Sequence, residues 1–256
     1  MGGNARHALN QDGPAGLRVV HADDWLLVVE KPPGMPSVPA RTDHDPPSVI
    51  ERLRAAEPGG FLEAAHRLDR DTSGLLVVAR SAESRRRLAL AFERGLVWKR
   101  YIALVEGSPP ADSGTLHLPL ARDPDSPPRQ RVDPVMGVRA TTRWRLLQAG
   151  VTKACGHEDR ASLLELEPVT GRSHQLRVHL SWLGTPIVGD PLYGRRSKRP
   201  IGRMLLHAAS IDLPHPRDDA RLVLRSQADF MPADWIGRLP ATSPTSRPFA
   251  STARTG

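Results

Sequence analysis

The sequence predicts an α+β protein built on a mixed, mainly antiparallel sheet. Short apolar runs typical of strands recur along the 256 residues, and many are separated by turn residues. Helical patterns are few. The regular alternation of strands and helices that marks a parallel sheet is absent, so we expect many strands in hairpins with a few inserted helices.

Strands are expected wherever short apolar or alternating runs occur. Residues 17–20 and 25–30 flank the turn "HADD", which predicts a hairpin. Residues 75–79, "LLVVA", form a continuous apolar run and predict a buried strand. The remaining candidates lie at residues 98–107, 115–120, 140–147, 162–168, 204–213 and 221–224.

Three helices are predicted, two of them from their end signals. One runs from Ser81, a suitable N-cap, to Gly95, a natural C-terminal stop. A second follows the same design from Ser173 to Gly184. The third covers residues 47–56, "PSVIERLRAA".

The two ends of the sequence differ from the body between them. Residues 1–16 are aperiodic, and we expect them to be flexible; residues 240–256 are rich in Ser, Thr, Pro and Arg, and we expect a disordered tail. Residues 17–239 read as one folded domain. Within it, residues 124–137 predict a long exposed basic loop, equally suited to RNA contact or to a solvated linker.

Composition favours an acidic polymer as partner. The net charge is +8, and only four of the 36 basic residues are lysines. Arginine binds phosphate through two N–H groups and stacks on bases, which favours nucleic acid; arginine codons of a GC-rich genome are the alternative. No segment approaches the roughly 18 consecutive apolar residues of a membrane span, and no signal peptide is evident. We therefore expect a cytoplasmic protein.

No metal site or cofactor is expected from the motifs. The sequence has neither HExxH nor paired CxxC, and Cys155 is its single cysteine. His174 and His179 lie five residues apart on a predicted helix, so they point in different directions. We therefore expect that any reaction proceeds without a cofactor.

Three polar stretches are candidates for such chemistry. "HRLDRDTSG" at residues 66–74 carries Asp69 and Asp71, "TGRSHQLR" at 170–177 surrounds a helix start that favours anions, and Tyr101 lies in an apolar strand. Each also has a structural reading, as a turn, an ion pair or a core residue. An aspartic protease needs an Asp motif that differs from the one in this stretch. A glycosidase needs two carboxylates, for which Glu165 or Glu167 would join Asp69. From the residues alone, the choice stays open.

Five motifs closely resemble those of the RluA-like RNA pseudouridine synthases. They are "VVEKPPGMPSVP" at 28–39, "HRLDRDTSGLLVVARS" at 66–81, "KRYIALVEG" at 99–107, "GRSHQLRVHLSWLGTPIVGDPLYG" at 171–194 and "RMLLHAASIDLPHP" at 203–216. They occur in the family's order and span about residues 17–230. The resemblance makes residues 17–239 the catalytic domain, with the pseudouridine synthase fold and its central cleft. Because only about 16 residues precede the first family strand, we expect a stand-alone type without the S4 domain that many relatives carry.

The resemblance implies isomerisation of uridine to pseudouridine in structured RNA, without cofactor or metal. It makes Asp69 the catalytic carboxylate, which either attacks C1′ or removes the 2′ proton. Arg177 would keep Asp69 ionised, and Tyr101 would stack on the uracil and serve in proton transfer at C5. Leu205 or Leu206 matches an apolar residue that packs in the pocket.

Further arginines are implied in RNA binding. Arg67 would fill the space of a flipped-out base, and Arg70 and Arg172 would meet phosphates. The expected substrates are stem-loops of 23S ribosomal RNA, transfer RNA or both, and a monomer is expected. The alternatives are a non-catalytic RNA-binding or chaperone module on the same fold, and a nucleoside glycosidase.

Overall fold

The computed structural model describes residues 13–39, 46–151, 161–194 and 202–231. No helix in these ranges is long and apolar enough to cross a membrane. The predicted C-terminal tail and most of the predicted flexible N-terminal segment lie outside the described residues. The last part of that segment forms a 3₁₀ turn, Pro14–Gly16, and Ala15 packs against the core.

Twelve strands and three α-helices make up the described part of the chain. The strands are β1 (Arg18–Ala22), β2 (Leu26–Lys31), β3 (Glu63–Ala64), β4 (Ser73–Ala79), β5 (Trp98–Glu106), β6 (Ser113–His117), β7 (Leu120–Arg122), β8 (Gln130–Val132), β9 (Thr141–Val151), β10 (Ala161–Pro168), β11 (Leu206–Pro214) and β12 (Arg221–Arg225). The helices are α1 (Val49–Ala56), α2 (Ala82–Glu93) and α3 (Gln175–Trp182).

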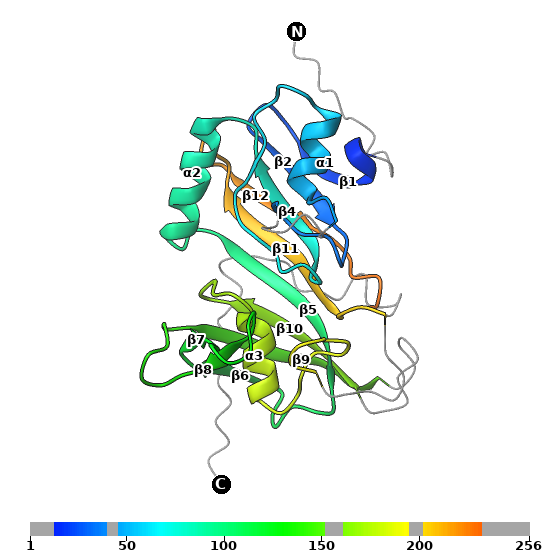
Figure 1. Ribbon diagram of the computed structural model, residues 1–256, viewed down its shortest axis with the longest axis vertical. Coiled ribbons are helices and arrows are strands. Elements are labelled where there is room, and N and C mark those ends of the chain that lie inside the picture. Colours follow the sequence, from blue (N-terminus) through cyan, green and yellow to red (C-terminus); the bar gives the residue numbers. More distant parts are fainter. Residues whose placement is uncertain (1–12, 40–45, 152–160, 195–201, 232–256) are drawn as a thin grey trace.

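A ten-stranded sheet dominates the fold, and the predicted α+β class is confirmed. Its main path is β1-β2-β4-β11-β5-β10-β9-β6, with β12 paired to β11 and β3 to β4. Among the described strands, the neighbours are antiparallel except for the parallel pair β4 and β11. Figure 1 shows β5 as the long strand that joins the part of the sheet flanked by α1 and α2 to the part that carries α3.

One of the two predicted N-caps is confirmed, and the third helix, α1, also begins at a serine cap. Ser48 forms a complete capping box with Glu51, and the Ser81 hydroxyl accepts the Ser84 N–H. The prediction of Ser173 as the other cap is wrong. The residue before α3 is His174, in the left-handed conformation (φ 54°) and without a side-chain cap.

The predicted exposed loop at 124–137 is also partly wrong. Residues 130–132 form β8, which pairs with β7 in a small second sheet. The short alternation of "QRV" carries too few apolar residues to be read as a strand. The turn that follows β8 remains exposed, with Val135 86% and Met136 78% accessible.

The parallel contact between β4 and β11 depends on a glycine. Gly74 has φ +110°, and a Cβ there would lie 2.4 Å from the Ala208 carbonyl oxygen. Any side chain at this position would push the two strands apart. The loop that precedes Gly74 carries Asp69, so this contact places the loop beside the centre of the sheet.

Candidate active site

The Asp69 loop connects β3 to β4 and is fixed by backbone contacts. The Thr72 N–H donates to the Asp69 carbonyl at 3.1 Å, which closes a turn. The buried Ser37 hydroxyl donates to the Leu68 carbonyl at 2.9 Å and accepts the Leu68 N–H at 3.0 Å. These bonds hold the backbone on both sides of Asp69, so its carboxylate projects from a rigid frame.

Lys31 ties the same loop to the end of β2. Its fully buried Nζ donates to the carbonyls of Pro32, Met35 and Arg70 at 2.9, 2.7 and 2.8 Å. Burial lowers the pKa of Lys31 to about 7, against the opposing charges of Asp71 and Asp69. The three carbonyl bonds assign Lys31 a role in holding the loop rather than in contacting substrate.

Arg177 on α3 links Asp69 to a second, buried carboxylate. Its Nη1 donates to Asp69 Oδ2 at 3.3 Å. On the other side, Nε and Nη2 donate to the two oxygens of Asp190, each at 2.8 Å. Asp190 Oδ1 also accepts the N–H groups of Leu192 and Tyr193. Asp190 therefore holds Arg177 in place on the side away from Asp69. This leaves Nη1 to donate to Asp69.

Burial and charge at this site favour an ionised arginine. Burial opposes the charge of Arg177, but Asp190 and then Asp69 raise its pKa. Burial likewise raises the pKa of Asp190, but the Arg177 guanidinium outweighs it and lowers that pKa below its usual range. The side chain of Asp69 is 26% exposed, against 4% for Arg177. The Asp69 carboxylate thus faces the open side, with the Arg177 cation behind it.

A tyrosine and a histidine support the guanidinium. The Tyr193 ring centroid lies 5.2 Å from Arg177 Cζ. The Tyr193 hydroxyl is 2.8 Å from His174 Nδ1 and accepts the Gln130 N–H at 2.7 Å. The left-handed conformation of His174 turns its ring to meet this hydroxyl, at the start of α3.

Tyr101 lies on strand β5, opposite Ala208 of the neighbouring strand β11. Its ring is buried, and burial followed by the charge of Asp69 raises its pKa, so the phenol stays protonated. Leu206 belongs to the same core cluster as Tyr101. Leu205 belongs to a second cluster with Ile102 and therefore lies on the other face of the sheet.

The three arginines predicted to bind RNA, Arg67, Arg70 and Arg172, are all exposed. Arg70 Nε donates to the Gly34 carbonyl at 3.2 Å, and Arg172 Nε donates to the Arg139 carbonyl at 3.3 Å. Arg67, next but one to Asp69, makes no hydrogen bond or ion pair with any other described residue. Its side chain is the most available of the three.

The carboxylates that a glycosidase would need are already neutralised. Glu165 is 1% exposed and accepts hydrogen bonds from Arg100 at 2.9 Å and Arg145 at 2.5 Å. Glu167 pairs with Arg143 at 2.9 Å. Neither offers a free second carboxylate beside Asp69.

The comparisons with known proteins identify the class. A model of the RNA pseudouridylate synthase family matches residues 25–182. Among solved structures, human RNA Pseudouridylate Synthase Domain Containing 1 is 30% identical, with a TM-score of 0.71 over 86% of each chain. The chain belongs to the RNA pseudouridine synthase family, whose members isomerise uridine to pseudouridine in RNA.

Within that family the chain is an RluA-like member. It is 37% identical to the dual-specificity RNA pseudouridine synthase RluA of Haemophilus influenzae, over 84% of this chain and 94% of the relative. The Escherichia coli K12 protein of the same name is 36% identical over the same shares. An uncharacterised RNA pseudouridine synthase of Zymomonas mobilis is 40% identical over 77% of this chain.

Sequence reasoning missed Asp190 and Tyr193. Both stand inside the quoted stretch "GRSHQLRVHLSWLGTPIVGDPLYG", and Tyr193 is one of only two tyrosines in the chain. That rarity was the available signal. The sequence does not show that residues 13 positions apart, Arg177 and Asp190, form a pair.

Proposed function

We propose that this enzyme modifies uridines in stem-loops of both ribosomal and transfer RNA. The relatives with about 37% identity over most of their length are named dual-specificity enzymes, which supports two RNA classes. We also propose that it acts in the cytoplasm, where both RNAs are found. The proposed catalytic residues Asp69, Tyr101 and Arg177 all belong to one copy of the chain, which supports a monomer.

The observation that carries the proposed mechanism is the contact of 3.3 Å between Arg177 Nη1 and Asp69 Oδ2. In the reaction the C1′–N1 bond breaks, the uracil turns, C5 bonds to C1′, and the C5 proton leaves to N1 or to solvent. Asp69 starts this sequence, either by attack on C1′ or by removal of the 2′ proton. Arg177 keeps the carboxylate charged and oriented, without itself reacting.

The uridine must leave its stack to reach Asp69. Flipping a base out costs a few kcal/mol, and less in a loop than in a duplex. We propose that Arg67, which is exposed, occupies the vacated space beside Asp69. Arg70 and Arg172, which flank the site, would meet phosphates. Leu206 would pack against the uracil together with Tyr101, whereas Leu205, on the other face, supports the strand.

The direct experiment measures tritium release from C5-tritiated uridine in ribosomal and transfer RNA. The wild type should release tritium from both RNAs. Asp69→Asn should release none and still bind RNA, because only the reacting oxygen is lost. Asp71→Asn, two residues away in the same turn, is the matched control and should stay active. Retained label with wild type on both RNAs would overturn the proposal, and free uracil would indicate a glycosidase.

Tyr101→Phe assigns the role of the phenol. If Tyr101 acts by stacking, the phenylalanine variant should keep most of its tritium release. If it takes part in proton transfer at C5, release should fall while RNA binding persists. An unchanged KM with a lower kcat therefore marks the hydroxyl as part of the chemistry.

A further inference from the structure

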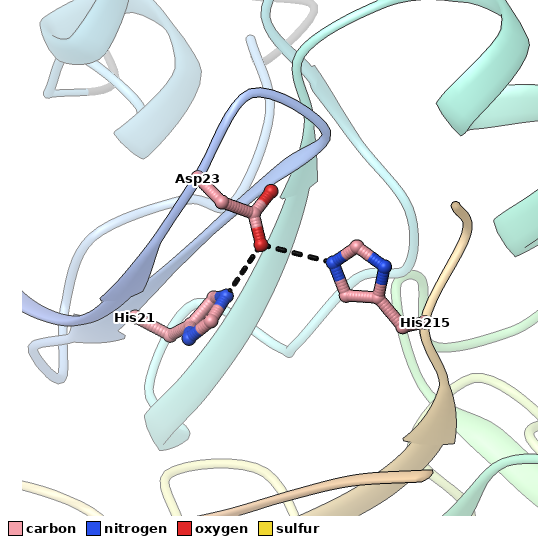
Figure 2. Close-up of side chains that lie close together, drawn as sticks. All are labelled: His21, Asp23 and His215. Atoms are coloured by element: carbon pink, nitrogen blue, oxygen red, sulfur yellow. Dashed lines mark hydrogen bonds and ion pairs between the residues drawn. The ribbon is translucent and has the colours of Figure 1, made fainter. Parts of the chain in front are cut away.

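A second cluster of polar side chains lies outside the catalytic site. His21, Asp23 and His215 meet with their ligand atoms all within 4.8 Å of one another. Figure 2 shows the two imidazoles converging on one carboxylate oxygen, Asp23 Oδ2, from two hairpins. His21 Nε2 lies 2.7 Å and His215 Nε2 lies 2.9 Å from that oxygen.

The backbone fixes each of these groups. Asp23 sits in the β1–β2 turn, and its Oδ1 accepts the N–H groups of Trp25 at 2.7 Å and Leu26 at 2.9 Å. This leaves Oδ2 directed at the imidazoles. His215 sits in the β11–β12 turn, where its N–H donates to the Ala220 carbonyl at 2.8 Å. The cluster is therefore preformed by two closed turns.

The cluster is accessible from solvent. Its side chains are between 15% and 31% exposed, and they line a hollow of about 330 Å³ together with Asp24 and Asp218. The basic members of this hollow are Arg217 and Arg221, and Arg221 is engaged with Asp212 and stacks on Trp98. An ion can reach the three donors without any rearrangement of the fold.

We propose that His21, Asp23 and His215 bind a divalent transition-metal ion of the zinc type. Two imidazole nitrogens and one carboxylate oxygen are a donor set that zinc accepts, with a fourth position open to the hollow. Donors about 2.0–2.2 Å from a tetrahedral ion lie about 3.3–3.6 Å apart. The two contacts with Asp23 Oδ2 need to open by about 0.4–0.9 Å, and the two imidazole donors, which lie within 4.8 Å of each other, need to reach the same separation. Magnesium and calcium prefer oxygen ligands and should not compete.

One outer contact of His215 suits a metal ligand, whereas the Arg217 N–H bond to Nδ1 must break when the ion binds. Without an ion, Nε2–H donates to Asp23 and Nδ1 accepts the Arg217 N–H at 3.2 Å. With an ion on Nε2, that proton is released and Nδ1 takes one up, so the imidazole stays neutral. Nδ1 then faces Asp218 Oδ1, 3.7 Å away, which is the kind of carboxylate that orients a metal-bound histidine.

The site is structural rather than catalytic. In the register of β2 with β4, Leu26 lies opposite Ala79 at the end near Asp23, and Lys31 lies opposite Gly74 at the end near Asp69. Five residues of strand, about 17 Å, separate these ends. The ion would cross-link the β1–β2 and β11–β12 hairpins and stabilise the folded state, without touching the uridine.

Calorimetric titration of the EDTA-treated full chain with Zn²⁺ is the decisive measurement. The wild type should bind about one equivalent saturably. His21→Gln and His215→Gln should each lose at least about tenfold in affinity, as much as loss of an outer contact costs. Glutamine keeps an N–H donor for Asp23, so the turns should remain folded. His117→Gln, an exposed histidine bonded to Thr141, is the matched control and should bind as the wild type does.

Thermal unfolding provides the second readout. Zinc at about a hundredfold excess over the wild-type Kd should raise the wild-type Tm by about 5 °C or more, and the Tm of His215→Gln by at most about half as much, because a site weakened at least tenfold is then at most about tenfold over its own Kd. Tritium release should be the same with EDTA as with zinc, because the ion is remote from Asp69. Absence of saturable binding at micromolar zinc, or equal affinity in the wild type and both glutamine variants, would overturn the proposal.

Discussion

At the scale of single residues, the site is a line of charges that runs from the interior to the surface. Asp190 is buried, Arg177 lies between, and Asp69 faces outward. A guanidinium with two N–H groups committed to Asp190 has little freedom to rotate. The position of the proposed catalytic carboxylate, Asp69, therefore depends on Asp190, which lies on the far side of Arg177.

Asp190→Asn should lower kcat by about a hundredfold, because a small displacement of Arg177 misplaces Asp69. It should also reduce the stability of the fold by about 3–5 kcal/mol, since Arg177 loses its main buried counter-charge. Single-turnover kinetics and urea unfolding measure the two effects. The control is Asp212→Asn, which removes a different buried carboxylate, one that lies on β11. It should affect stability alone. A kcat loss in the control equal to that of Asp190→Asn would contradict a positioning role for Asp190.

Motif resemblance predicted Asp69, Tyr101 and Arg177, and the physical reading of the residues could not choose between Asp69 and Asp71. The structure places Arg177 on Asp69, while Asp71 lies in the turn. The roles of Asp190 and His174 could be found only from the three-dimensional structure. The pair between Asp190 and Arg177 depends on how α3 packs, and the left-handed backbone of His174 has no reliable signal in sequence.

At the scale of elements, the strands were largely predictable and their order was not. The apolar runs at 17–20, 25–30 and 75–79 became β1, β2 and β4, because burial of one or both faces dictates the pattern. The pairing of β4 with β11 joins residues more than 130 positions apart. Apolar periodicity carries no information on which distant strand will pair.

Gly74→Ala should destabilise the enzyme by about 3 kcal/mol or more, through both the positive φ and the overlap with Ala208. The matched control is Gly59→Ala, which has φ +83° and open space around its Cβ position. It should cost only about 1–2 kcal/mol of backbone strain. Urea unfolding of both variants separates the two contributions. Equal losses would mean that the close contact between β4 and β11 is unimportant.

His207 on β11 predicts a loss of stability in mild acid. Its ring lies between the hydroxyls of Ser73 and Ser226, each 2.8 Å away. Burial lowers the pKa of His207 to about 4, against opposing charges led by Glu30. Between pH 6.5 and 4 the unfolded chain binds a proton that the folded chain rejects, so stability falls as pH falls through this window. The effect is on the order of 3 kcal/mol.

Urea unfolding at pH values from 4 to 7 measures this dependence. His207→Gln should weaken the pH dependence in that window, because the variant has no proton to gain at this position. An identical slope in the wild type and His207→Gln would show that other groups cause the acid sensitivity.

At the scale of the whole molecule, charge prepares the enzyme for its polyanionic substrate. The net charge of +8 comes with exposed arginines on both sides of the Asp69 loop, Arg67 and Arg70 before β4 and Arg172 before α3. Neutralised phosphates release counterions, so binding depends on salt. The composition correctly predicted a nucleic acid as the partner. It does not reveal where on the surface the RNA lies.

RNA affinity should fall at least about tenfold between 50 and 200 mM salt, as expected for three or more neutralised phosphates. The kcat at saturating RNA should change little, because the chemistry follows binding. Filter binding and tritium release over this range test the two statements. An affinity that is independent of salt would argue against an interface led by phosphate contacts.

The pairing of β4 with β11 also has a consequence for how the protein is made. During translation the loop with Asp69 leaves the ribosome early, but its neighbour in the sheet is encoded more than 130 residues later. Until β11 emerges, the Ser73–Gly74 end of β4 has no partner on that side, since β3 covers only Val78 and Ala79, and Arg177 precedes β11 by only about 30 residues. We therefore expect the proposed catalytic site to assemble only after β11 has been translated.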